Sequence, residues 1–125
     1  MKFARYRAHG QVSYGVLDGG TLREITTTPF EEYIVTDHTH SLSEVKLLTP
    51  TSPSKILAVG LNYASHLQDR SPLEQPLIFL KTPSSLVAHG DVIVRPRGVE
   101  TLDEEGELVV EGREEGWWRG GHHVV

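Results

Sequence analysis

The stretch LDEEGELVV, residues 102–110, places two carboxylates two positions apart beside an apolar run. In a β-strand alternate side chains share a face, so Glu105 and Glu107 project together while Gly106 and Leu108 point to the other side. Carboxylates held that close repel each other unless a cation lies between them, and such hard oxygen ligands suit Mg²⁺, Mn²⁺ or Ca²⁺. Acidic runs are also typical of solvated strand edges, so the spacing alone leaves a metal site and a plain surface edge open.

The composition is that of a globular protein of one or two small domains. The chain has 125 residues, of which 38% are hydrophobic and 23% charged, and this length supports one domain with a modest core or a small domain plus part of a second. Its 12 glycines and 7 prolines indicate many turns. We therefore expect a mainly β chain with minor helix.

The charge and cysteine content exclude several kinds of partner. A formal net charge of −5 leaves no basic stripe for a phosphate backbone, so we expect no nucleic acid partner. The absence of cysteine rules out disulfides and thiolate metal sites. No apolar run approaches the ~20 residues of a membrane span, and the first residues do not resemble a signal peptide. These features favour a cytoplasmic protein without membrane contact.

The first fifty residues predict a small N-terminal β domain. Strand candidates at 3–6, 12–17 and 21–25 are separated by the turn sequences His9-Gly10 and Asp18-Gly19-Gly20, which is typical of an antiparallel meander. The polar stretch 37–40, Asp-His-Thr-His, favours an exposed loop. The sequence TPTSPS at 49–54 breaks helix and sheet alike, so we place a domain boundary there.

Residues 51–110 predict a second segment that carries candidate catalytic side chains. Apolar runs at 55–59 and 76–81 are typical of buried strands, and 92–94 of a short strand. If residues 63–69 begin a helix, His66 and Asp69 share a face, and the carboxylate can orient the imidazole for proton transfer. Lys81 at a strand end can neutralise an anionic substrate. A surface His–Asp pair and a solvated lysine are the alternatives.

Four blocks in this order resemble the fumarylacetoacetate hydrolase family, in the bacterial branch with a small extra N-terminal domain. The resemblance covers roughly residues 1–110. The four blocks that carry it lie at 55–66 (KILAVGLNYASH), 76–86 (PLIFLKTPSSL), 90–94 (GDVIV) and 105–108 (EGEL). The resemblance implies a mixed β-roll and a divalent metal, usually Mg²⁺, held by Glu105, Glu107 and a further Asp. It also implies 2-oxo or β-diketo acid substrates, with C–C hydrolysis, decarboxylation or isomerisation as reactions.

The resemblance also implies roles for the remaining candidates and a homodimer for full-length members. His66 would be the base, oriented by Asp69, and Lys81 the cation that faces the substrate. Members often have Glu at the position of Asp69 and an aromatic residue at that of Glu104, and they continue for ~100 residues past the Glu-x-Glu strand to complete a domain of ordinary size.

Residues 111–125 follow no hydrophobic period, and we expect this atypical tail to be disordered. A truncated gene or a shifted reading frame after about Val110 would explain the tail, and a natural short variant is the other interpretation. Two classes of function thus stay open: a metal-dependent enzyme of 2-oxo acids or its N-terminal part, and a non-catalytic remnant that serves as a binding or dimerisation module.

Overall fold

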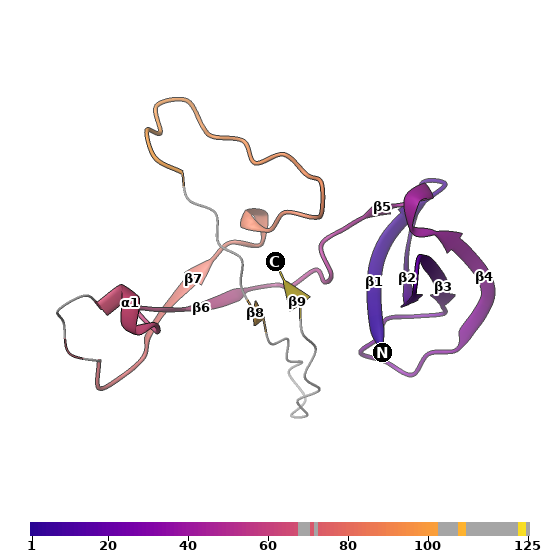
Figure 1. Cartoon of the computed structure of the whole chain (residues 1–125), viewed down its shortest axis with the longest axis horizontal. Coiled ribbons are helices and arrows are strands. Elements are labelled where there is room, and N and C mark those ends of the chain that lie inside the picture. The colour runs from indigo at the N-terminus through magenta and orange to yellow at the C-terminus, as the bar shows by residue number, and fades with distance from the viewer. Residues whose placement is uncertain (68–70, 72, 103–107, 110–122, 125) are drawn as a thin grey trace. The chain divides into compact units, whose positions relative to one another are not determined.

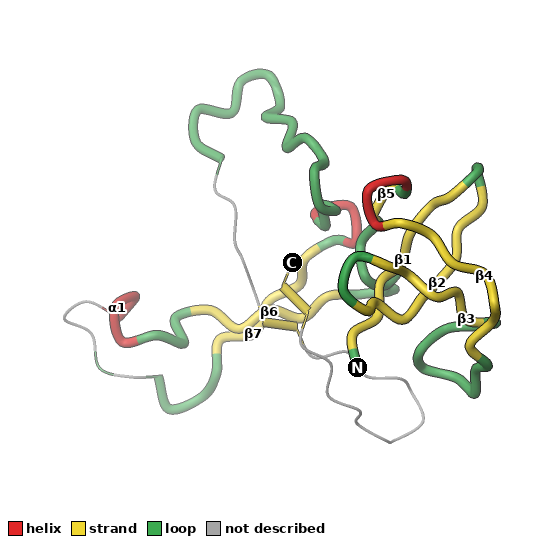
Figure 2. Tube along the Cα trace, turned by 45° about the vertical axis from the view of Figure 1, so that its right-hand side comes forward, coloured by secondary structure: helices red, strands yellow, loops and turns green. Residues whose placement is uncertain are grey.

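A computed structural model of the chain describes residues 1–67, 71, 73–102, 108–109 and 123–124. The chain divides into two compact units, one made of Met1–Thr51 with the residues from Val87 onward, the other of Ser52–Leu86 (Figure 1). We call them unit 1 and unit 2 and describe each by itself. Strands predominate and helices are short in both, so the expected mainly β fold is confirmed (Figure 2).

Unit 1 is built on a curved five-stranded antiparallel sheet with the order β4-β3-β2-β1-β5. Its strands are β1 (Lys2–Ala8), β2 (Gln11–Asp18), β3 (Thr21–Ile25), β4 (Val35–Ser41) and β5 (Lys46–Leu47), with the 3-10 turn η1 (Leu42–Glu44) between the last two. The predicted meander of the first three strands is confirmed. His9 and Gly10 both have positive φ, 49° and 82°, as the two central residues of a type I′ hairpin turn require.

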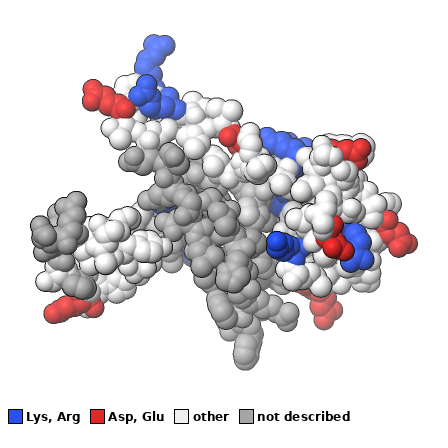
Figure 3. All heavy atoms as spheres, in the orientation of Figure 1, with Lys and Arg blue, Asp and Glu red and all other residues white. Residues whose placement is uncertain are grey.

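The core of this sheet is small. Among the described residues its fully or nearly fully buried apolar side chains are Tyr6, Val16, Leu22 and Ile25, contributed by β1, β2 and β3. Alternate residues of a strand share a face, so the strand registers put Tyr6 and Leu22 on one face of the sheet and Val16 and Ile25 on the other. Figure 3 shows acidic and basic side chains interspersed on the visible face of unit 1.

The loop that we expected at residues 37–40 is wrong, although Asp37, His38 and Thr39 are exposed as expected. Asp37 to His40 lie inside β4, an edge strand that pairs with β3, for example through Leu22 with His40. Val35, Thr36 and Thr39 are β-branched and fit a pleated surface despite their polar neighbours. Pairing with β3, and not local polarity, decides the structure of this stretch.

Unit 2 consists of the antiparallel pair β6 (Ile56–Gly60) and β7 (Leu77–Lys81), the helical turn α1 (Ala64–Leu67) and the 3-10 turn η2 (Pro83–Ser85). The strands lie where the apolar runs predicted them, but their expected burial is wrong. Leu57 is 64% exposed and Leu80 is 71% exposed. A continuous apolar strand is buried only when both of its faces are covered, and the described part of unit 2 offers no second layer.

The chain after η2 has little regular structure where it is described. The short strand expected at 92–94 is not formed, and Val92 and Val94 are 80% and 77% exposed. Leu108–Val109 form β8, which pairs antiparallel with β9 (His123–Val124). None of the helices in the described ranges is long and apolar enough to cross a membrane.

Candidate active site

His66 lies in α1, the short helical turn that follows β6. Leu61, directly after Gly60, has a φ of 53°, and the backbone N–H of His66 donates to the carbonyl oxygen of Tyr63 at 2.9 Å. The rings of Tyr63 and His66 meet edge to face with 5.6 Å between their centroids. The His66 side chain is exposed, so its imidazole can exchange protons with a solvent-borne substrate.

Asp69, the expected partner of His66, lies outside the described residues. The helical start that would place the two side chains on one face is present at residues 64–67. Orientation of the imidazole by this carboxylate therefore stays a prediction.

Lys81 is the last residue of β7 and is half-buried. Its Nζ lies 5.9 Å from the centroid of the Phe79 ring, two residues earlier on the same face of the strand. A lysine ammonium over an aromatic face is stabilised by the ring quadrupole, which orients the cation at this end of the strand.

The register of the strand pair separates His66 from Lys81. Gly60 pairs with Leu77 at one end, and Ile56 pairs with Lys81 at the other. His66 follows Gly60 in the chain, so the two candidate residues belong to opposite ends of the pair, which are about 13 Å apart at the usual rise per residue. The described structure does not bring His66 and Lys81 together.

The predicted metal ligands Glu105 and Glu107 lie outside the described residues. Elsewhere, within the described ranges, no three His, Asp or Glu side chains are grouped closely enough to hold a metal ion. Two carboxylates are the donor set that hard divalent cations prefer, so the chemistry of Glu105 and Glu107 fits Mg²⁺. Their geometry stays a prediction.

A polar cluster in unit 1 was not predicted from the sequence. The hydroxyl of Tyr6 donates to Oε2 of Glu24 at 3.2 Å, and Nε2 of His40 lies 3.9 Å from the same oxygen. Burial, followed by the negative charge of Glu24, raises the pKa of Tyr6 to about 12. The three residues come from β1, β3 and β4, and the pairing of these strands puts them on one face of the sheet, so no local spacing signals the cluster.

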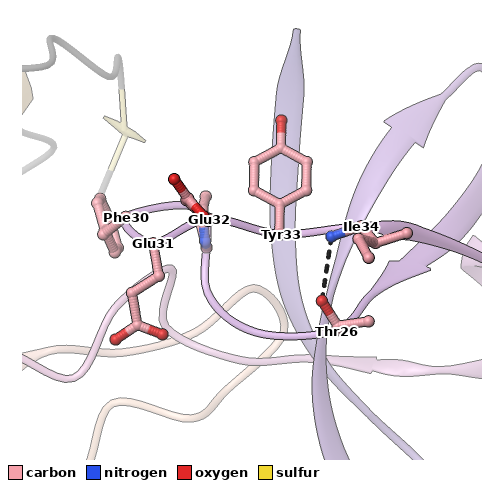
Figure 4. Close-up of a pocket in the computed structure, with 7 residues that line it drawn as sticks. Thr26, Phe30, Glu31, Glu32, Tyr33 and Ile34 are labelled. Carbon is pink, nitrogen blue, oxygen red and sulfur yellow. Dashed lines mark hydrogen bonds between the residues drawn. The ribbon is translucent and has the colours of Figure 1, made fainter.

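A pocket of about 720 Å³ lies at the connection between β3 and β4 (Figure 4). The backbone N–H of Ile34 donates to Oγ1 of Thr26 at 3.1 Å, and the N–H of Thr26 to the carbonyl oxygen of Ile34 at 3.0 Å, so the loop is closed at its base. Aromatic, aliphatic and acidic side chains line it: Thr26, Pro29, Phe30, Glu31, Glu32, Tyr33 and Ile34. None of the predicted site residues contributes to it.

Two family models match the chain. Residues 1–50 match the Rv2993c-like N-terminal domain, and residues 55–112 match the fumarylacetoacetate (FAA) hydrolase C-terminal domain. Protein Rv2993c of Mycobacterium tuberculosis is 31% identical over 119 residues, which are 88% of this chain and 45% of that protein. Oxaloacetate tautomerase YisK of Bacillus subtilis is 41% identical over 78 residues, 57% of this chain and 26% of that enzyme.

A solved structure shows the same relationship. The X-ray structure of 5-carboxymethyl-2-hydroxymuconate delta-isomerase from Mycobacterium smegmatis superposes with a TM-score of 0.58 at 34% identity, covering 70% of this chain and 35% of that one. The chain thus spans less than half the length of the relatives it matches. The two family models together match most of the chain: an Rv2993c-like N-terminal domain at residues 1–50, followed by a fumarylacetoacetate hydrolase domain at residues 55–112. The chain therefore belongs to the fumarylacetoacetate hydrolase family.

Proposed function

We propose that this chain supplies the first part of a metal-dependent enzyme that acts on small 2-oxo acids. The observation that carries the proposal is the match of residues 55–112, because His66, Lys81, Glu105 and Glu107 all lie in this range. Relatives named as an oxaloacetate tautomerase and a hydroxymuconate isomerase favour isomerisation or tautomerisation. C–C hydrolysis and decarboxylation remain the alternatives within the family.

Under this proposal Glu105 and Glu107 hold a divalent cation, and Mg²⁺ is the first choice. When bound, the ion supplies Lewis-acid polarisation of the substrate's carboxylate and neighbouring oxo oxygen. Tautomerisation of the keto form requires a proton to leave the carbon next to the carbonyl and a proton to be delivered to the carbonyl oxygen, which gives the enol; the reverse reaction moves the proton back to carbon. We assign that step to the exposed imidazole of His66, with Asp69 as the residue that orients it.

Lys81 has a separate role in the proposal. Its ammonium neutralises an anionic group of the substrate, but the register of β6 and β7 puts it at the opposite end of the strand pair from His66. The two groups therefore act on different parts of a bound molecule, or on different sites. The lack of cysteine and the net charge of −5 fit a cytoplasmic enzyme of small molecules, and we expect a homodimer as its working form.

Titration of Mg²⁺ against the melting temperature of the purified protein tests the metal site. A bound ion stabilises the folded state by RT ln(1 + [L]/Kd), which is about 2.7 kcal/mol at a hundredfold excess over Kd. We expect Glu107→Gln to abolish this stabilisation. Glu44→Gln, an exposed carboxylate in η1 of unit 1, is the matched control and should leave it unchanged. Equal Mg²⁺ stabilisation of the parent and Glu107→Gln proteins would remove Glu107 from the metal site.

A further inference from the structure

An ion pair in unit 1 joins the two family segments of the chain. Nζ of Lys46 lies 2.7 Å from Oδ1 of Asp91. Lys46 belongs to the range of the Rv2993c-like model, and Asp91 to that of the fumarylacetoacetate hydrolase model. The contact therefore connects two segments that the family models treat as separate domains.

Asp91 is oriented by its own turn. The backbone N–H of Ala88 donates to Oδ2 of Asp91 at 3.1 Å, and the N–H of Asp91 donates to the carbonyl oxygen of Ala88 at 3.0 Å. Gly90 completes the turn with a φ of 77°, which glycine adopts without strain. One carboxylate oxygen thus closes the turn while the other meets Lys46, so less rotamer freedom is lost when the pair forms.

Lys46 is fixed by the sheet. Residues 46 and 47 form β5, where Lys46 pairs with Arg7 of β1, and the N–H of Leu48 donates to the carbonyl oxygen of Arg5 at 2.9 Å. The lysine backbone is therefore anchored to β1, which lies next to the central strand β2, and its side chain reaches out to Asp91.

The position of this pair in the chain gives it a structural role beyond one contact. The chain leaves unit 1 after Thr51 and returns at Val87, and the pair joins residues on either side of that excursion. The enclosed residues 52–86 contain β6, α1 and β7, with His66 and Lys81. The Lys46 and Asp91 side chains are 57% and 33% exposed, and exposed ion pairs of that kind contribute little to stability, so the contact can open.

We propose that Lys46 and Asp91 form a releasable latch that holds the turn at residues 88–91 on the sheet of the N-terminal domain and closes the segment carrying His66 and Lys81. Salt weakens the latch because both side chains are solvent-accessible. The hydrogen bond from Lys46, followed by that from Ala88, holds the pKa of Asp91 below its usual range. The pair therefore persists through neutral pH and is lost as pH falls through that lowered pKa.

A zero-length carbodiimide tests the contact directly, because it joins a lysine amine to a carboxylate only when the two touch. We expect mass spectrometry of the cross-linked full chain to find an amide between Lys46 and Asp91 at low salt. Lys46→Arg keeps the charge but has no amine to couple, so it should lose this link. Lys55→Arg, at an exposed lysine outside the pair, should keep it. Links between other lysines and carboxylates without one between residues 46 and 91 would overturn the proposal.

Hydrogen exchange tests the mechanical role. Lys46→Gln should speed amide exchange in residues 87–91 by up to about fivefold, a small factor because exposed ion pairs are weak. Lys46→Arg should leave the rate at the parent value, and Lys55→Gln is the matched control. Asp91→Asn should raise the exchange rate less in the Lys46→Gln protein than in the parent, because the ion pair is already absent there. Parent-like exchange in Lys46→Gln, or fully additive effects, would contradict a latch.

Discussion

At the scale of the residue, Tyr6 shows how one side chain organises the N-terminal sheet. Its ring fills the core with none of its surface exposed, and its hydroxyl finds a partner in Glu24 at 3.2 Å. A buried phenol needs such an acceptor, because an unsatisfied buried donor costs about 1–3 kcal/mol. The same burial, together with the charge of Glu24, keeps the phenol neutral far into the alkaline range.

This environment predicts a loss of stability at alkaline pH. The pKa of Tyr6 is about 12 in the folded protein and ~10 in the unfolded chain, so its contribution is fully present below about pH 10. The contribution is lost as pH rises from about 10 to about 12, by about 3 kcal/mol in all. Urea unfolding at pH values across this range should show the loss in the parent protein and a much smaller one in Tyr6→Phe.

Tyr33→Phe is the control for general effects of tyrosine ionisation, because the Tyr33 hydroxyl makes an exposed hydrogen bond, in which it donates to Met1 Sδ, a weak acceptor, at 3.5 Å. The Tyr33→Phe protein should lose as much stability at alkaline pH as the parent protein does. An identical pH dependence in the parent and Tyr6→Phe proteins would show that the Tyr6 phenol is not the group responsible.

At the scale of the element, the sequence predicts where strands lie in the chain better than it predicts how they pair and what buries them. The boundaries of β1, β2 and β3 follow from local alternation and from the His9-Gly10 turn. β4 was missed because residues 37–40 are polar on both faces, and only pairing with β3 makes them a strand. The burial of β6 and β7 was wrong because an apolar run does not indicate what covers it.

For the candidate site, too, the sequence predicts which elements carry the residues but not how these elements place them in space. Local motifs predict His66 after β6 and Lys81 at the end of β7, and the elements lie where expected. The register that sends the two residues to opposite ends of the strand pair is a non-local property that no spacing encodes. The Tyr6–Glu24–His40 cluster and the Lys46–Asp91 contact depend on pairing of distant segments for the same reason.

A glycine in β2 tests how tightly the strands of unit 1 pack. A Cβ added at Gly15 would lie 2.9 Å from the backbone oxygen of Arg23 and 3.2 Å from the Tyr6 ring. Because backbone cannot yield as a flexible side chain does, we expect Gly15→Ala to destabilise the protein by about 1–3 kcal/mol in urea unfolding. Gly20→Ala, with open space around it, should change stability by less than about 0.5 kcal/mol. Equal effects of the two substitutions would refute close packing at Gly15.

At the scale of the whole molecule, a matched family domain and catalytic competence are different properties. The chain covers 35% of the solved isomerase and 26% of the tautomerase, so their activities describe much longer proteins. A catalytic site works by excluding water and holding its groups fixed. In the described part of this chain His66 is exposed, and Lys81 lies at the other end of its strand pair.

We therefore expect the 125-residue chain by itself to give no Mg²⁺-dependent tautomerisation of oxaloacetate. A misplacement of ~1 Å can lower a rate about a hundredfold, and the described part of unit 2 offers no second layer to hold the exposed imidazole of His66 in place. The assay follows the enol and keto forms with Mg²⁺ and with EDTA, in the parent and in His66→Ala, which should be indistinguishable. Stabilisation by Mg²⁺ without turnover would leave the proposed metal site intact. Turnover that EDTA and His66→Ala both abolish would show instead that this chain brings its imidazole to a bound substrate unaided.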